Sequence, residues 1–352
     1  MKKHNFSAGP SILPQSVIKQ ASEAILNFNN LDLSLIEISH RSADFVAVMD
    51  KAVALVLEIA NLDASEYDVL FQHGGASTQF IATAHNLLPV GGKAGFINTG
   101  TWSSKAIKET RLYGDVAVLA SSKEDGFRHI PKEFTIPNDI DYLHITSNNT
   151  IFGTQYNKYP TANVPVIIDM SSDIFSRDID YSQFDLIYAG AQKNIGASGT
   201  TLVIVKKSLF GKSGRTIPSM LDYKLQAAKG SMFNTPSVFS IYVSMLYLQW
   251  LKDLGGVAEV EKINNAKATL LYNEIDSNSN FVGYAAKEDR SIMNVTFNLT
   301  DESKKERFEQ LAKEAGIHGL NGHRSVGGYR ASIYNALPLE SVQVLVDVMQ
   351  DL

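Results

Sequence analysis

The chain has 352 residues, of which 44% are hydrophobic and 20% are charged, and its formal net charge is −5. This composition is ordinary for a globular protein of about two domains and lacks the basic character of a nucleic-acid-binding protein. The absence of cysteine excludes disulfides, thiolate metal sites and cysteine nucleophiles. No stretch approaches the ~20 apolar residues of a membrane-spanning helix, and Phe6–Pro14 is too short and broken for the apolar region of a signal peptide, so we expect a cytoplasmic protein without a membrane partner.

The first two thirds of the chain alternate between helical and strand-like patterns. From Ser42 to Leu62 apolar residues recur at helical spacing behind a serine suited to cap a helix. Seven short β-rich runs follow, each ending in a polar or glycine-rich turn: Tyr67–Gln72, Ala94–Asn98, Asp115–Leu119, Tyr142–Thr146, Val164–Asp169, Leu186–Ala189 and Thr201–Val205. Helical patterns at Thr78–Leu87 and Trp102–Tyr113 separate several of them. The alternation predicts a mainly parallel α/β sheet, in which ligands bind at the carboxyl ends of the strands.

After Val238 the pattern changes to long helices followed by isolated strands. The predicted elements are helices at Val238–Lys252 and Val257–Ile275, a strand at Ile292–Leu299, a helix at Ser303–Ala315, a strand at Tyr329–Tyr334 and a last helix entered at Pro338. Such a succession indicates a smaller α+β domain. We therefore expect a large domain over residues 16–256 and a small C-terminal domain over residues 257–352, with residues 1–15 as an N-terminal segment packing on the small domain.

A glycine-rich turn, His73-Gly74-Gly75-Ala76-Ser77, follows one predicted strand and opens a helix. Glycines allow a sharp turn, and the free N–H groups at a helix start can bind a phosphate. The turn is neither a Walker A loop nor a GxGxxG fingerprint, which disfavours a nicotinamide-dependent dehydrogenase and favours a ligand with a single phosphate. An ordinary turn between strand and helix is the alternative.

Asp169 ends the apolar run Val164–Ile168. A carboxylate at a buried strand end costs free energy unless it is paired. One interpretation is a carboxylate facing a pyridinium nitrogen, which keeps that nitrogen protonated and the ring an electron sink. The alternative is a helix cap, because Ser171 and Ser172 follow.

Lys193 stands among small residues in Ala189-Gly190-Ala191-Gln192-Lys193-Asn194-Ile195-Gly196, directly after a predicted strand. Most lysines are solvated surface charges, but desolvation in a tight turn would lower the pKa of this amine and favour imine formation. A carboxylate, a lysine and a glycine-rich phosphate site together are the groups that a pyridoxal-phosphate site needs.

These residues belong to longer blocks that closely resemble the phosphoserine aminotransferases, a family of class-V pyridoxal-phosphate aminotransferases. The blocks are Phe6-Ser7-Ala8-Gly9-Pro10, Ser39-His40-Arg41-Ser42, Gly74–Ser77, Asn149-Thr150-Ile151, Tyr188–Gly196 and Gly322–Asn335. The resemblance implies the aspartate-aminotransferase-like α/β fold (fold type I), with a mainly parallel seven-stranded sheet in the large domain. It also implies a homodimer with active sites at the subunit interface.

The resemblance further implies roles for the residues that match the family pattern. Lys193 would hold pyridoxal phosphate as a Schiff base and later move a proton between substrate and cofactor, while Asp169 would pair with the pyridine nitrogen. Trp102 would stack on the ring, and Thr150 would hydrogen-bond the cofactor. The phosphate would be bound by Ala76, Ser77 and Gln192, and from the neighbouring subunit by Asn234 and Thr235.

For the substrate, the resemblance implies that Arg330 binds the α-carboxylate in bidentate fashion. His40, Arg41, His323 and Arg324 would surround the distal group, which is a phosphate in phosphoserine and a carboxylate in glutamate. Surface salt bridging is the alternative for either His-Arg pair taken alone, and no metal site is implied. Many relatives have serine in place of Ala8 and glutamate in place of Asn149.

The expected function is reversible transamination between O-phosphoserine/3-phosphohydroxypyruvate and glutamate/2-oxoglutarate in L-serine biosynthesis. 4-Phosphohydroxythreonine, in pyridoxine biosynthesis, is a further candidate substrate. The alternatives are another aminotransferase of this fold, such as an alanine–glyoxylate type, and a non-catalytic pyridoxal-phosphate-binding protein. The presence of Lys193, Asp169 and Arg330 argues against the second alternative.

Overall fold

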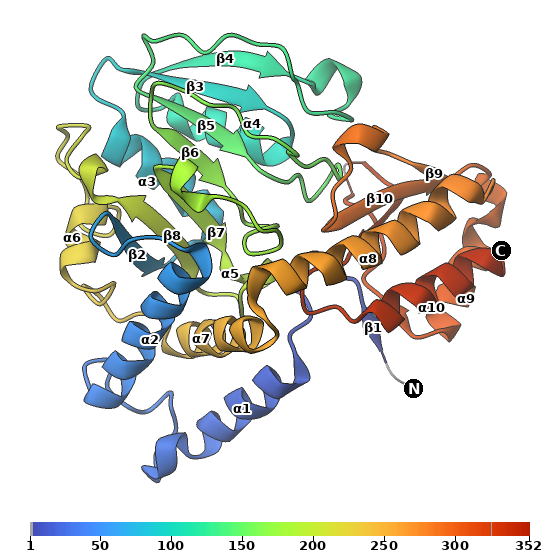
Figure 1. The fold of residues 1–352 in the computed structure, drawn as a ribbon, viewed down its shortest axis with the longest axis horizontal. Helices are drawn as coiled ribbons and strands as arrows, with labels where there is room; N and C mark the ends of the chain where they lie inside the picture. The colour runs from blue at the N-terminus through green and yellow to red at the C-terminus, as the bar shows by residue number, and fades with distance from the viewer. Residues whose placement is uncertain (1–2, 325) are drawn as a thin grey trace.

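The computed structural model of the protein describes residues 3–324 and 326–352. Within these residues a seven-stranded sheet forms the centre of the larger part of the chain, in the order β2-β8-β7-β6-β5-β3-β4 (Figure 1). The strands are β2 (Tyr67–Gln72), β3 (Lys93–Asn98), β4 (Asp115–Ser121), β5 (Tyr142–Thr146), β6 (Val166–Asp169), β7 (Leu186–Gly190) and β8 (Thr201–Lys206). β8 runs antiparallel to both its neighbours and the other strands run parallel to one another. The predicted mainly parallel sheet is confirmed.

Helices cover both faces of this sheet, so its central strands are buried on both sides. The helices on one face are α3 (Gly75–Leu87), α4 (Thr101–Thr110) and α6 (Tyr223–Ala228), and those on the other are α1 (Gln15–Leu26), α2 (Ala43–Ala60) and α7 (Val238–Asp253). Successive residues of β6 point to opposite faces of the sheet. Ile167 packs in the core under α3 and α4, and Ile168 packs in the core under α2 and α7. Ser42 caps α2, its side chain accepting from the Phe45 N–H.

The C-terminal part of the chain builds a second core around a three-stranded antiparallel sheet of order β12-β10-β9. Its elements are β9 (Phe281–Gly283), β10 (Asn294–Leu299), β12 (Tyr329–Ser332), α8 (Gly256–Ser277), α9 (Lys305–Glu314) and α10 (Leu339–Gln350). Phe281 packs edge-on against Phe297 and Phe308, with ring centroids 5.7 and 5.3 Å apart. Helices and sheet therefore share one apolar layer.

Two segments connect the cores. α8 runs from one to the other (Figure 1): Val257 and Val260 pack in the core of the large sheet, and Leu271 packs in the small one. The change of core therefore falls within α8, a few residues after its start. At the N-terminus, β1 (His4–Asn5) pairs in parallel with β11 (Ile317–His318), and Phe6 enters the small core. None of the helices in the described residues combines the length and apolar character needed to cross a membrane.

Candidate active site

A pocket of about 430 Å³ opens at the carboxyl ends of the parallel strands, between the two cores. β6 ends in Asp169, β7 leads into the short helix α5 (Ala191–Asn194) that carries Lys193, and the turn after β2 carries Gly74. The lining residues are Ala8, Gly9, Gly74, Gly75, Ala76, Ser77, Trp102, Thr146, Asn148, Thr150, Ile151, Asp169, Ser171, Ser172, Gln192, Lys193, His323 and Arg330. Strand ends, an N-terminal segment and the small-domain strand β12 thus meet in one cavity.

The Lys193 side chain is half-buried because it faces this pocket. Its ammonium donates to Thr150 Oγ1 at 2.7 Å and lies 5.4 Å from the centroid of the Trp102 ring. Burial lowers the pKa of Lys193 to about 8; the charge of Asp169 opposes this shift and that of Arg330 adds to it. The amine is therefore neutral far more often near pH 7 than a surface lysine, and the neutral form is the nucleophile and proton acceptor.

The turn that carries Lys193 is fixed from two directions. The Ser11 N–H donates to the Gln192 carbonyl at 2.9 Å, and the Ser11 hydroxyl donates to the Lys193 carbonyl. A Cβ on Gly9 would lie 3.2 Å from Lys193 Cγ, so the glycine allows the N-terminal segment to pack closely against the lysine. On the other side, the Asn335 N–H donates to Asn194 Oδ1 at 3.0 Å.

Asp169 is 4% exposed. Its Oδ1 accepts from the Ser171 N–H at 2.9 Å. Burial raises the pKa of Asp169, and the hydrogen bonds from Ser171 and the charge of Lys193 oppose the shift. The contact with Ser171 belongs to a turn over residues 170–176 and not to a helix, so the helix cap that the sequence offered as an alternative is wrong; the carboxyl group lines the pocket. A buried carboxyl group of this kind gains most from a cationic partner inside the cavity.

The N-terminus of α3 forms one wall of the pocket. Gly74 has φ +89°, and a Cβ there would come within 1.8 Å of Thr78 Oγ1, so this turn requires glycine. At Gly75 no atom lies within 4 Å of the Cβ position, which leaves open space in front of the helix start. Ala76 and Ser77 are in the first turn, where unpaired N–H groups and the helix dipole favour an anion.

Arg330 reaches the pocket from β12. Its Nη1 donates to the Thr150 carbonyl at 3.2 Å, whereas its buried Nε has no hydrogen-bond partner among the described residues. Burial lowers the pKa of Arg330. An unused, desolvated guanidinium donor is suited to a bidentate carboxylate ligand.

Five of the residues that the resemblance singles out lie outside the pocket of one chain: His40, Arg41, Asn234, Thr235 and Arg324. Asn234 lines a neighbouring cavity of about 110 Å³ with His73 and Gly74. Four of the five are exposed, whereas His40 is buried before α2.

Several pocket residues were not predicted from the sequence. Thr146 ends β5, Asn148 follows it, and Ser171 and Ser172 follow β6, so the rule that ligands bind at strand ends could have found them. The side-chain Oδ1 of Asn148 and hydroxyl of Thr146 are buried without a partner among the described residues, which leaves polar atoms free for a ligand. Ala8 lines the pocket through its small side chain, and its carbonyl accepts from the Tyr334 hydroxyl at 2.8 Å.

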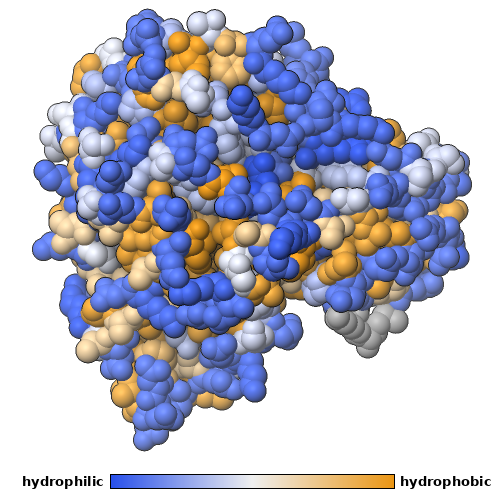
Figure 2. All heavy atoms as spheres, viewed as in Figure 1, coloured by the Kyte–Doolittle hydropathy of each residue, from blue (hydrophilic) through white to orange (hydrophobic). Residues whose placement is uncertain are grey.

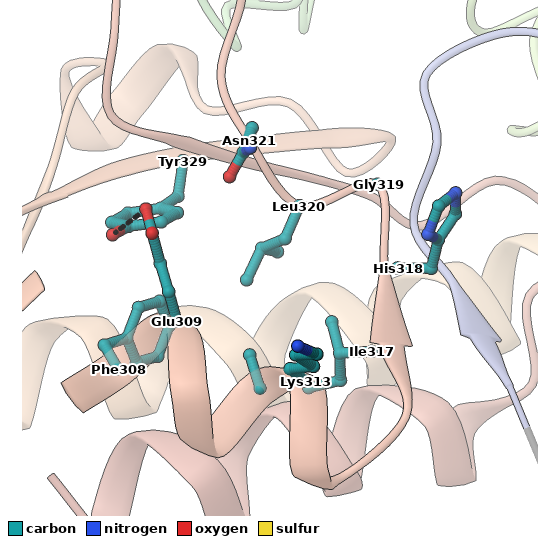
Figure 3. Close-up of a pocket in the computed structure, with 10 residues that line it drawn as sticks. Phe308, Glu309, Lys313, Ile317, His318, Gly319, Leu320, Asn321 and Tyr329 are labelled. Atoms are coloured by element: carbon teal, nitrogen blue, oxygen red, sulfur yellow. Dashed lines mark hydrogen bonds between the residues drawn. The ribbon is translucent and has the colours of Figure 1, made fainter. Parts of the chain in front are cut away.

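A separate cavity of about 360 Å³ lies in the small domain between α9 and the segment from β11 to β12 (Figure 3). Figure 3 shows Tyr329 and Glu309 facing one another at its rim, joined by a hydrogen bond of 3.4 Å. Tyr329 lines this cavity and Arg330 lines the other, because successive residues of β12 point to opposite faces. The small-domain cavity contains no residue singled out for the active site.

Comparison with known proteins supports one family. The model of the class-V aminotransferase family matches residues 3–345. The phosphoserine aminotransferase of Flavobacterium johnsoniae is 62% identical over 352 residues, covering 100% of this chain and 99% of that protein. A solved phosphoserine aminotransferase, studied for radiation damage of its Schiff base, is 47% identical with a TM-score of 0.96 over 100% of this chain and 99% of its own.

The PLP-bound phosphoserine aminotransferase of Trichomonas vaginalis is 33% identical, with a TM-score of 0.92 over 99% of this chain and 100% of its own. Family model, sequence relatives and solved structures agree over essentially the full chain. The architecture with its mainly parallel sheet is therefore that of fold type I. The chain belongs to the class-V aminotransferases and, within them, to the phosphoserine aminotransferases.

Proposed function

We propose that this chain transfers an amino group between O-phosphoserine and 2-oxoglutarate, using pyridoxal phosphate held by Lys193. The observation that carries the proposal is the shared cavity in which the half-buried Lys193 amine, with a pKa of about 8, lies within the electrostatic reach of the buried Asp169 carboxyl group. Few groups other than a cationic heteroaromatic ring with an aldehyde would use both at once.

The residues present fit this cofactor at each end. The open space at Gly75 and the first turn of α3 suit a phosphate group, with Ala76, Ser77 and Gln192 around it. The Trp102 ring lines the cavity and provides a surface for stacking, and Thr150 lies within hydrogen-bond distance of the Lys193 amine. When bound, the cofactor supplies an electron sink for the charge that develops at the substrate Cα.

Lys193 has two tasks under this proposal. As a neutral amine it binds the cofactor covalently, and a pKa near 8 increases its neutral fraction at pH 7 by roughly two orders of magnitude over an ordinary lysine. Its free amine would then move the proton between the substrate Cα and the cofactor C4′. Ser11 and Asn335 hold the turn that carries Lys193 in place, and so keep the amine at a fixed position in the pocket.

Asp169 would keep the ring nitrogen of the bound cofactor protonated. Burial raises the pKa of its carboxyl group and the charge of Lys193 opposes this shift; a protonated ring nitrogen would add a further opposite charge that favours the carboxylate. The Ser171 N–H fixes one carboxyl oxygen, so the other can face the ring. The carboxylate acts on the electronic state of the ring and moves no proton of the substrate.

Substrate anions meet two cationic positions. Arg330, with a free Nε donor, would bind the α-carboxylate beside Lys193. His323 lines the same pocket, and Arg324 follows it in the chain. Together with His40 and Arg41 they would bind the distal phosphate or carboxylate, so that one basic region serves both half-reactions.

We propose that the protein acts as a homodimer and that the partner subunit supplies the missing positions. Arg41, Asn234 and Thr235 are exposed and lie outside the pocket of their own chain. An apolar groove of about 490 Å³ between α1 and α7 includes Ile18, Leu26 and Phe239. Hydrophobic residues show on the surface in Figure 2 in the region where Figure 1 draws α1, α2 and α7. A second copy of the chain would cover this surface.

Mixed dimers test this sharing. Arg41→Ala is expected to lower kcat/KM for O-phosphoserine by about 10- to 100-fold, since one charged contact to the phosphate is lost, and Lys193→Ala removes turnover. In a dimer with one subunit of each kind, one site keeps its own Lys193 and receives an intact Arg41 from the partner. We expect the mixed dimer, isolated with two affinity tags, to recover about half of the wild-type activity.

The matched control pairs Lys193→Ala with Arg330→Ala. Arg330 and Lys193 line the pocket of the same chain, so neither site of that mixed dimer is complete and its activity should stay low. Failure of the Lys193/Arg41 mixture to recover activity, with the mixed dimer present, would place Arg41 in its own chain's site or outside any site.

We further propose that the reaction serves L-serine biosynthesis in the cytoplasm, with 4-phosphohydroxythreonine of pyridoxine biosynthesis as a second substrate of the same chemistry. Both substrates carry a phosphate that the basic positions around His323 would bind. An alanine–glyoxylate type of transaminase, the competing assignment, acts on unphosphorylated amino acids and would leave those cations without a substrate group.

A further inference from the structure

A fourth cation lies beside the basic residues of the pocket. Lys105 is exposed on α4, one turn after Trp102. Its ammonium lies 4.5 Å from the centroid of the Trp102 ring, and the Lys193 ammonium lies 5.4 Å from the same centroid. Trp102 and Lys193 both line the pocket, so the Lys105 charge lies against a residue of the cavity wall.

The charge of Lys105 reaches the region where the distal group of the substrate would bind. Burial lowers the pKa of His323, and the charges of Arg330, Arg324 and Lys105 lower it further. Arg330, Arg324 and Lys105 all carry a positive charge. A concentration of positive charge in a protein of net charge −5 favours the binding of an anionic ligand.

The two amino donors differ in the charge that they bring to this position. A phosphate monoester carries about −1.5 to −2 at pH 7, whereas the γ-carboxylate of glutamate carries a single negative charge. An exposed ammonium acts through Coulomb attraction more than through fixed hydrogen-bond geometry, because it is a compact, mobile point charge. Its contribution therefore grows with the charge of the ligand.

We propose that Lys105 is a specificity-determining residue that favours the phosphorylated substrate over glutamate. The inference rests on the proposed function and deepens it, since it names a residue that distinguishes the two half-reactions. Arg330 meets the α-carboxylate common to both substrates and cannot make this distinction. Lys105 meets the end of the molecule where the two differ.

Lys108 offers a matched control. It lies on the same helix, one turn beyond Lys105, and is likewise exposed. Replacing either lysine with glutamine removes one positive charge from α4 with little change in helix propensity. The net charge of the protein changes equally in both variants, so a difference between them reports the position of the charge.

The experiment measures kcat and KM of the holoenzyme for O-phosphoserine with 2-oxoglutarate and for glutamate with 3-phosphohydroxypyruvate. Lys105→Gln is expected to lower kcat/KM for O-phosphoserine about 3- to 10-fold through KM, and that for glutamate less than about 2-fold. The loss should shrink as ionic strength rises, Lys105→Arg should restore the wild-type ratio, and Lys108→Gln should leave it unchanged. Tryptophan fluorescence of the holoenzyme titrated with inorganic phosphate should show the same weakening without turnover.

An equal loss for both substrates, an equal effect of Lys108→Gln, or no effect of Lys105→Gln would overturn the inference. These outcomes differ from a failure of the proposed function itself. In that case the wild-type holoenzyme would not turn over O-phosphoserine at all, and there would be no wild-type kcat/KM with which to compare the variants.

Discussion

Lys193→Ala is expected to lower kcat by at least about 10⁴-fold and to abolish covalent attachment of the cofactor. The amine is the only group proposed both to bind the cofactor and to move the substrate proton, so its removal eliminates both steps. Borohydride reduction followed by peptide mapping of the wild-type protein should find the cofactor on Lys193 and on no other lysine. The variant should release all of its cofactor on denaturation.

Two controls separate chemistry from structure in this variant. Thermal unfolding should show a folded protein, because the Lys193 side chain is half-buried in a cavity and removing it exposes little apolar core. A small primary amine added to the variant should restore part of the turnover, since it can carry the proton that Lys193 no longer carries. Turnover within about tenfold of the wild type, with no added amine, would show that another residue performs the proton transfer.

Asp169→Asn is expected to lower kcat by about 10²- to 10³-fold while the cofactor stays covalently bound. The amide has nearly the shape of the carboxyl group and can keep the hydrogen bond from the Ser171 N–H, but it brings no charge to hold a proton on the ring nitrogen. Loss of a preorganised electrostatic partner in a buried site typically costs this much. Pre-steady-state measurement of the first half-reaction tests whether the chemical step is the one slowed.

The stability of this variant provides an independent readout. Burial raises the pKa of Asp169, so the unpaired carboxylate is costly in the folded protein without cofactor, and a neutral amide should leave the melting temperature of that form equal or higher. Asp169→Glu keeps the charge but moves it by one methylene, and should fall between the wild type and Asp169→Asn. Equal rates for the wild type and Asp169→Asn would remove the carboxylate from the mechanism.

The large sheet could be predicted from the sequence because its strands are continuous apolar runs between turns. Each of the seven ranges agrees with the structure to within two residues at either end. In β5, β6 and β7 every residue is buried. The largely apolar run in the sequence therefore begins and ends close to where the strand does. The strand order and the antiparallel direction of β8 are set by pairing over long sequence distances and had no local signal.

The missed elements lack the pattern on which such predictions depend. α1 begins after Pro14 without a side-chain cap, and two of its three buried residues are alanines, so few large apolar residues mark its buried face. β1 and β11 have two residues each and exist only because they pair with one another. Tyr329–Tyr334 was predicted as one strand, but β12 ends at Ser332; the segment beyond it turns inward, where the buried Lys267 ammonium donates to the carbonyls of Ile333 and Tyr334.

For the site, the sequence indicated the groups near strand ends and could not indicate how segments combine. Asp169 ends one strand of the large sheet, and Lys193 and Gly74 follow two other strands of it, so the parallel direction of these three strands brings them to one edge. The resemblance added Arg330, which enters from another core. The contact between Asn335 and Asn194 joins positions 141 residues apart, and neither the spacing of residues nor the composition of the sequence predicts it. The role proposed for Arg41 depends on a second chain, which the sequence of one chain cannot place.

The most direct test of the central claim is the absorbance spectrum of the purified protein with pyridoxal phosphate, recorded before and after adding O-phosphoserine. We expect the yellow band of the lysine-bound cofactor to disappear on addition of O-phosphoserine and to return with 2-oxoglutarate, while alanine at the same concentration leaves it nearly unchanged. A protein that stays colourless with the cofactor, or a yellow band that O-phosphoserine does not alter, would contradict the assignment of Lys193 and of the reaction.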